Sequence, residues 1–124
     1  MQDTHLPHDH GAHSHKLLAH MPQLATCETV SEAFKLLSDP RRVQIYWLLC
    51  HCEECVINLS AMVQMSSPAV SHHLKLLKAS GLVTSRREGK EVYYTAAQTD
   101  TALALHRMIE KMISVTCPTE HEKG

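Results

Sequence analysis

Two short helical segments followed at once by a hairpin constrain the fold more than any other feature of this sequence. Residues 59–63 and 67–80 carry apolar side chains at helical spacing, and Gly81 marks the end of the second segment. Residues 82–95 read LVTSRREGKEVYYT, in which β-branched and aromatic residues flank the tight-turn signal Glu-Gly-Lys. This pattern predicts two short antiparallel strands directly after a pair of short helices.

Helical signals also precede and follow this region. Thr29-x-x-Glu32 is the spelling of a capping box and predicts a helix that begins at Thr29. Asp39 and Pro40 predict the end of that helix and the start of the next, with Asp39 as the N-terminal cap. A closing helix is predicted from apolar side chains at helical spacing, namely Leu105, Met108, Ile109, Met112 and Ile113. The expected fold class is mainly α with a β-hairpin, an α+β arrangement.

Helix, short turn, second helix and basic hairpin form the layout of a winged helix-turn-helix, whose second helix enters the DNA major groove. The local charge agrees, because residues 66–95 hold five Lys or Arg side chains against two Glu, a net +3 in a chain of net charge −1. A solvated helix face is the alternative interpretation of the same residues. The candidate DNA contacts are Ser67, Ser71, His72, His73, Lys75, Arg86, Arg87 and Lys90.

The apolar stripe of the closing helix predicts an interface between two copies of the chain. Its five side chains are too apolar for a lone surface helix, so we expect them to be buried across a twofold axis. The winged helix-turn-helix is therefore expected to be a homodimer.

Three of the five cysteines lie within six residues, at positions 50 to 55. Cys52 and Cys55 have the C-x2-C spacing that lets two thiolates close on one ion, although a structural or redox role is the alternative. Soft thiolates favour Zn²⁺, Cd²⁺, Pb²⁺, Cu(I) or As(III) over Mg²⁺ or Ca²⁺. Cys50 continues the apolar face of its helix and is expected to be a buried small hydrophobe.

The first 22 residues hold six of the eleven histidines and almost no apolar periodicity. They are expected to be a solvated tail or a loose collector of Zn²⁺ or Ni²⁺, with His13, His15 and His20 among its candidate ligands. The predicted organisation is a His-rich flexible tail over residues 1–25, a DNA-binding and dimerisation domain over 26–117, and a C-terminal tail over 118–124.

Three segments, LLSDPRRVQIYWLL, SSPAVSHHLKLLKASGLV and RREGKEVYYT, resemble the ArsR/SmtB family of bacterial metal-responsive repressors. The resemblance covers residues 26 to about 116. It implies a homodimer in which the first and last helices form the interface. It also implies that the metal-free protein binds an operator in double-stranded DNA and that bound metal lowers this affinity.

The resemblance also bears on the metal ligands. Cys55 corresponds to the first cysteine of a family metal site, whereas Ile57 and Asn58 stand where further ligands often lie. In the family the remaining ligands come from the N-terminal segment, frequently of the other subunit, and here that segment offers Cys27 and the histidines. A second family site on the last helix is broken in this chain. His106 and Glu110 share a helix face there, as ligands across a dimer or as an exposed pair.

Two other classes of function were weighed. Cys27 and Cys117 would approach each other if the first and last helices pack together, which would make the protein a redox-sensing or reactive-sulfur-sensing repressor. An enzyme is not expected, since the sequence has no Gly-rich phosphate loop and no nucleophile-plus-base motif. No apolar run reaches the roughly 20 residues of a membrane span, and no export signal is evident, so a cytoplasmic protein is expected.

Overall fold

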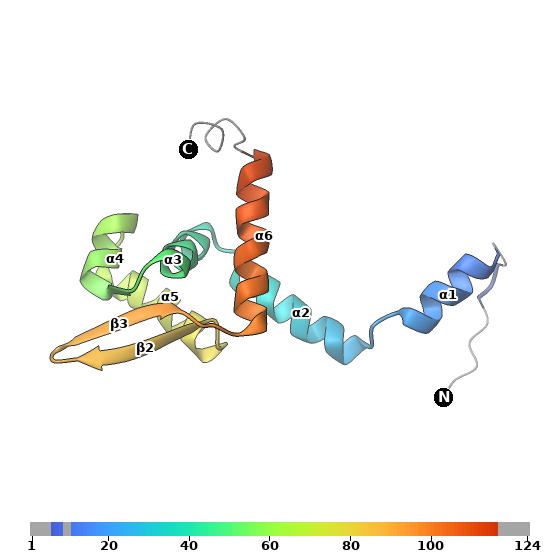
Figure 1. The fold of residues 1–124 in the computed structure, drawn as a ribbon, viewed down its shortest axis with the longest axis horizontal. Coiled ribbons are helices and arrows are strands. Elements are labelled where there is room, and N and C mark those ends of the chain that lie inside the picture. Colours follow the sequence, from blue (N-terminus) through green and yellow to red (C-terminus); the bar gives the residue numbers. More distant parts are fainter. Residues whose placement is uncertain (1–5, 9–10, 117–124) are drawn as a thin grey trace. The chain divides into compact units, whose positions relative to one another are not determined.

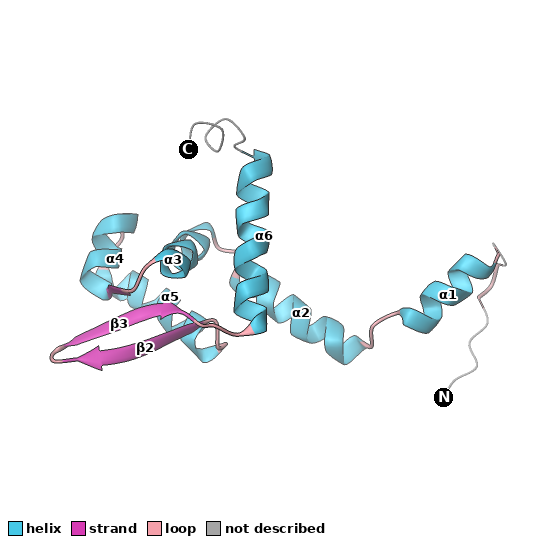
Figure 2. Ribbon diagram, viewed as in Figure 1, coloured by secondary structure: helices cyan, strands magenta, loops and turns pink. Residues whose placement is uncertain are grey.

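The structure, a computed structural model, describes residues 6–8 and 11–116 (Figure 1). The chain divides into two compact units, Met1–Glu32 and Ala33–Gly124, which are described separately below. Along the chain the elements are α1 (Ala12–His20), α2 (Leu24–Leu36), α3 (Pro40–His51), β1 (Glu54–Cys55), α4 (Val56–Val63), α5 (Ser67–Ala79), β2 (Val83–Glu88), β3 (Glu91–Ala96) and α6 (Asp100–Thr116). Figure 2 shows the predominance of helix. Across the described residues, every helix is too short or too polar to cross a bilayer.

The N-terminal unit contains α1 and most of α2. Helix α1 occupies part of the segment predicted to be a tail, and no sequence signal indicated it. Helix α2 begins at Leu24, so the predicted start at Thr29 is wrong. Thr29 lies inside the helix, where its hydroxyl donates a hydrogen bond to the carbonyl of Ala25 at 3.2 Å instead of capping a terminus.

The C-terminal unit has a core formed by α3, α4, α5, the hairpin and α6. The fully buried side chains include Ile45, Tyr46 and Leu49 of α3. Helix α6 packs on α3, and the Tyr46 hydroxyl donates a buried hydrogen bond to the carbonyl of Ala102 at 2.8 Å. The start of α3 is as predicted, because Pro40 lies in the first turn and the Asp39 carboxylate accepts from the Arg42 backbone N–H at 3.0 Å.

The helix-turn-helix consists of α4, a three-residue turn and α5. Gln64 adopts a left-handed conformation, with φ of 56°, directly after α4. The N-terminal cap of α5 is Ser66, whose hydroxyl accepts a hydrogen bond from the Ala69 N–H at 3.3 Å. At its other end α5 closes with a Schellman motif, in which Gly81 has φ of +81° and the Leu82 N–H bonds to the carbonyl of Leu77 at 3.0 Å.

Strands β2 and β3 form the predicted hairpin, with Glu88 opposite Glu91. Gly89 begins the two-residue turn with φ of +63°, a conformation that glycine adopts at little cost. A third strand was not predicted. The two residues of β1 pair antiparallel with β3, which places Cys55 opposite Tyr93, so the sheet order is β1-β3-β2.

Candidate DNA-binding and metal-binding sites

Helix α5 presents part of the predicted DNA-reading face to solvent. Ser71, His72 and Lys75 are exposed side chains of this helix. Ser67 is also exposed, and its hydroxyl lies 3.2 Å from the Ser60 hydroxyl of α4. These four side chains can reach phosphate oxygens or base edges without rearrangement of the core.

His73 lies on the opposite side of α5 and is only 8% exposed. Its Nδ1 accepts a hydrogen bond from Nε of Arg42 at 3.2 Å, and its Nε2 lies 4.0 Å from the Asp39 carboxylate. Burial lowers the pKa of this imidazole, outweighing the opposite effect of Asp39. In this structure His73 holds α5 against the start of α3, and its predicted contact with DNA stays a prediction.

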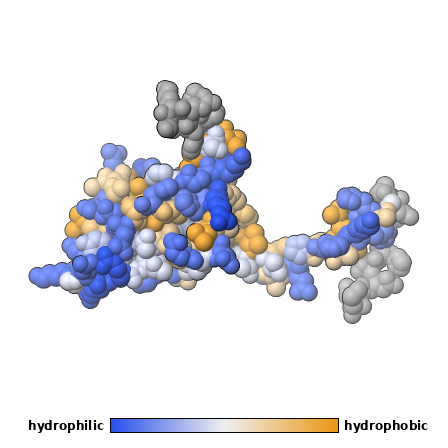
Figure 3. Space-filling model, viewed as in Figure 1, coloured by the Kyte–Doolittle hydropathy of each residue, from blue (hydrophilic) through white to orange (hydrophobic). Residues whose placement is uncertain are grey.

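The hairpin carries exposed cations, among them Arg87 and Lys90 near its tip. Figure 3 shows a strongly hydrophilic surface over this end of the hairpin. Lys78 of α5 donates to the Ser85 hydroxyl of β2 at 2.6 Å, which joins the helix to the hairpin. This surface provides the positive charge that phosphate binding needs.

Arg86 differs from its neighbours because its charge is already paired. Its guanidinium donates to both carboxylate oxygens of Glu53, at 2.8 and 2.6 Å, and to Glu88 at 2.5 Å. The guanidinium carbon also lies 4.9 Å from the centre of the Tyr93 ring. The bidentate pair holds the pKa of Glu53 below its usual range. Arg86 was predicted as a phosphate contact, yet its donors face protein carboxylates.

Cys52 and Cys55 flank Glu53 and Glu54 at the junction of α3, β1 and α4. Both thiols are partly buried, and the Cys52 thiol donates to the carbonyl of Leu48 at 3.2 Å. Burial, reinforced by the negative charge of Glu54, raises the pKa of Cys52. Among the described residues no third His, Cys, Asp or Glu joins these two thiols in one cluster. The donor set suits a soft metal but is incomplete within these residues.

The other predicted thiols lie elsewhere. Cys50 packs against the core as expected, although it is only partly buried, and burial raises its pKa to about 11. Cys27 is exposed on α2 within the N-terminal unit. Cys117 lies outside the described residues, so its predicted approach to Cys27 stays a prediction.

A second group of candidate ligands lies between α3 and α6. His51, His106 and Glu110 form the one set of three such side chains, in the described part of the chain, whose ligand atoms all lie within 4.8 Å of one another. The sequence indicated His106 and Glu110 but missed His51. The signal was weak because His51 is 55 residues from His106 and shares no motif with it.

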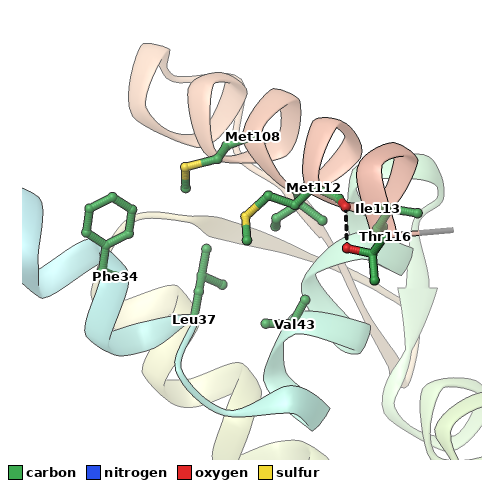
Figure 4. Close-up of a pocket in the computed structure, with 8 residues that line it drawn as sticks. Phe34, Leu37, Val43, Met108, Met112, Ile113 and Thr116 are labelled. Carbon is green, nitrogen blue, oxygen red and sulfur yellow. Dashed lines mark hydrogen bonds between the residues drawn. The ribbon is translucent and has the colours of Figure 1, made fainter. Parts of the chain in front are cut away.

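An apolar groove of about 480 Å³ runs beside α6 (Figure 4). Its lining includes Phe34, Leu37, Met108 and Met112, and Met112 is 62% exposed. The predicted stripe therefore divides. Leu105 is buried in the core of its own subunit and does not line the groove, whereas the other four side chains of the stripe line it, Ile109 being largely buried and Met112 the most exposed.

These features match known regulatory proteins. Residues 39–85 match the family described as bacterial regulatory protein, arsR family. The cadmium resistance transcriptional regulatory protein CadC of Listeria innocua is 40% identical over 85 residues, which cover 66% of this chain and 71% of the relative. The chain belongs to the ArsR family.

A second ArsR-family relative is a transcriptional repressor SmtB homolog from Synechocystis. It is 39% identical over 74 residues, which cover 60% of this chain. The chain spans only 56% of the length of that relative. Both matches concern DNA-binding regulators and not enzymes, in agreement with the sequence prediction.

Solved ArsR-family structures share the fold. A homodimeric winged helix-turn-helix DNA-binding domain from Mycobacterium bovis superposes with a TM-score of 0.64 at 31% identity, covering 73% of this chain and 82% of that one. The predicted winged helix-turn-helix is thereby confirmed, with α5 in the position of the recognition helix and β2–β3 as the wing.

Proposed function

We propose that this chain is a metal-responsive transcriptional repressor that releases its operator DNA when a thiophilic metal ion binds at Cys52 and Cys55. The relatives include regulators named for cadmium resistance, and the two partly buried thiols supply soft ligands of the kind that Cd²⁺, Zn²⁺, Pb²⁺ or As(III) prefers. Cys27, or a histidine of the N-terminal unit such as His13, His15 or His20, would complete the coordination.

One observation carries this proposal: the segment between the two thiols is bonded to the wing. Cys55 belongs to β1, which pairs with β3, and Glu53 holds Arg86 of β2 through two hydrogen bonds. A ligation event at the thiols therefore has a direct mechanical route to the hairpin that contacts DNA.

The mechanism uses this route. In the metal-free protein Glu53 fixes Arg86 and so orients the wing next to α5. A thiolate that held the ion would have no proton to donate, so Cys52 would give up its hydrogen bond to the carbonyl of Leu48. That change would shift the segment that carries Glu53, loosen its pair with Arg86 and alter the orientation of the wing. By linkage, DNA binding weakens metal binding by the same factor, and a coupling of about 1 to 3 kcal/mol gives roughly 5- to 150-fold regulation.

The proposed DNA contacts follow from exposure and charge. Ser67, Ser71, His72 and Lys75 lie on the open side of the recognition helix, and Arg87 and Lys90 provide wing cations. His73 is not included because it is buried, and Arg86 acts in the coupling because its charge is paired. We further propose a homodimer, since the similar domain from Mycobacterium bovis is homodimeric, and we place its interface at α6 and the groove beside it.

The test is operator release measured by fluorescence anisotropy, with a DNA duplex selected for tight binding by the metal-free protein. Cd²⁺ should release DNA from the parent protein, while Cys55→Ser should bind DNA normally and fail to release it. Cys50→Ser is the matched control and should still respond, because Cys50 packs against the core. Release by Cys55→Ser at the parent Cd²⁺ concentration would contradict the proposal. Release by peroxide in the presence of chelator would instead support the redox alternative with Cys27 and Cys117.

A further inference from the structure

Three polar side chains from two distant segments converge next to the only tryptophan of the chain. His51 is the last residue of α3, and His106 and Glu110 are one turn apart in α6. Nε2 of His51 lies 2.9 Å from Oε1 of Glu110, and Nε2 of His106 lies 3.3 Å from the same oxygen. The two Nε2 atoms are 3.4 Å apart. The side chains are 27 to 44% exposed, so an ion in solution can reach them.

The three separations suit tetrahedral coordination. Ligand atoms at 2.0 to 2.1 Å from a Zn²⁺ ion are roughly 3.3 Å from one another in a tetrahedron. The three distances here, 2.9, 3.3 and 3.4 Å, lie close to that value without any rearrangement. Two imidazoles and one carboxylate leave a fourth position for water.

The hydrogen bonding around Glu110 also points to a cation. The indole Nε1 of Trp47 donates to Oε1 of Glu110 at 2.8 Å, which orients the carboxylate. If both histidines donated as well, three N–H groups would compete for one oxygen that has two lone pairs. An ion bound by the deprotonated Nε2 atoms removes this competition, since the oxygen then faces the ion and the indole.

We propose that His51, His106 and Glu110 form a binding site for a divalent transition-metal ion of the Zn²⁺, Co²⁺ or Ni²⁺ class within one subunit. Imidazole and carboxylate ligands suit these ions better than they suit As(III) or Cu(I), which prefer thiolates. The bound ion joins the end of α3 to α6. The site uses no cysteine and does not rest on the function proposed for Cys52 and Cys55.

The experiment is a Co²⁺ titration of the full-length Cys55→Ser protein under reducing conditions, followed by visible absorption and by Trp47 fluorescence. Trp47 is the one tryptophan in the chain, and its ring centre lies 4.4 Å from that of His51. Paramagnetic Co²⁺ at this site should therefore quench its emission. We expect tetrahedral d–d bands and quenching that saturate together at one ion per subunit.

Adding His106→Gln should abolish both signals, and Glu110→Gln should do the same while keeping an oxygen that the Trp47 indole can bond. His20→Gln, which alters an exposed histidine of α1, is the matched control and should retain both signals. Circular dichroism establishes that each variant is folded, and the two variants change the site independently. Unchanged quenching and bands in folded His106→Gln or Glu110→Gln would overturn the proposal. Cd²⁺-induced DNA release by the Cys55→Ser protein, with these two signals intact, would refute only the function proposed for Cys52 and Cys55.

Discussion

At the scale of single residues, burial decides the role of His73. Its Nδ1 accepts a hydrogen bond from Arg42, which requires a neutral imidazole. Arg42 is itself held by the carbonyl of Leu36, at 2.9 Å. Protonation of His73 would place a positive charge against this guanidinium in a largely dry contact. The adjacent His72 is exposed, so two neighbouring identical residues serve different purposes.

The lowered pKa of His73 predicts a loss of stability in mild acid. Below the ordinary histidine value of 6.5 the unfolded chain binds a proton that the folded domain resists, so the free energy of unfolding falls as the pH falls. Urea midpoints of the metal-free protein should decrease between about pH 7.5 and about pH 5.5. His73→Gln should flatten this dependence, while the exposed His15→Gln should retain it. If the urea midpoint of His73→Gln falls with pH as steeply as that of the parent protein, the buried imidazole of His73 is not the cause of the pH dependence.

Tyr46 supplies a second residue-level prediction. Its buried hydroxyl bonds to the carbonyl of Ala102 and ties α3 to α6, and burial raises its pKa. Tyr46→Phe should lower the free energy of unfolding by about 1 kcal/mol, the usual contribution of a neutral hydrogen bond. Tyr94→Phe is the control, since its hydroxyl makes no hydrogen bond within the described residues. Urea unfolding measures the free energy of unfolding of each variant. An equal decrease in Tyr46→Phe and Tyr94→Phe would show that the hydrogen bond from Tyr46 to Ala102 does not stabilise the fold.

At the scale of elements, the wing contains cations of two kinds. Arg87 and Lys90 are exposed, whereas Arg86 is bonded to Glu53 and Glu88. Exposed cations displace counterions when they meet phosphates, and a paired cation releases fewer. Neighbouring positions on one strand should therefore affect DNA binding differently.

Lys90→Ala should weaken binding about equally for all DNA sequences and reduce the slope of log affinity against log salt by about 0.9, the value for one lost phosphate contact. Glu53→Gln should weaken DNA binding by the metal-free protein and reduce the metal-induced release, because it loosens the bond to Arg86 that orients the wing. Anisotropy titrations across salt concentrations measure the DNA affinity and its salt dependence, and the same titrations with and without Cd²⁺ measure the metal-induced release. A parent-like response to Cd²⁺ in Glu53→Gln would break the proposed route from the thiols to the wing.

Short sequence motifs were sufficient to predict most helices and strands. They were insufficient to predict which of these elements contact one another. Asp39 and Gly89 specify a cap and a turn through their own chemistry, so both were predictable. Strand β1 has two residues and exists because β3, almost forty residues later, is there to pair with it. His51 joins His106 for the same reason, through the packing of α3 on α6. Helix periodicity cannot reveal partners so far apart in sequence.

At the scale of the whole molecule, the division of the α6 stripe limits how a dimer can form. Leu105 stabilises the core of its own subunit and is only 6% exposed, so it offers almost no surface to a partner. The open groove, whose lining includes Met108, Met112 and Phe34, is an apolar surface that remains along α6. Exposed methionines adapt to the shape of a partner, which suits them to an interface formed by two copies of one helix.

Met112→Glu should therefore dissociate the proposed dimer without unfolding the subunit, because the side chain is 62% exposed in the isolated chain. A twofold interface receives the new carboxylate twice, and burying these charges should cost about 2 kcal/mol or more, roughly 30-fold in the dimer dissociation constant. Ile57→Glu, at a position 67% exposed on α4, is the matched control and should leave the dimer intact. Sedimentation equilibrium measures the association, and anisotropy measures the accompanying loss of DNA affinity, since two recognition helices must bind together. A Met112→Glu protein that stays dimeric at parent affinity would exclude this groove from the interface.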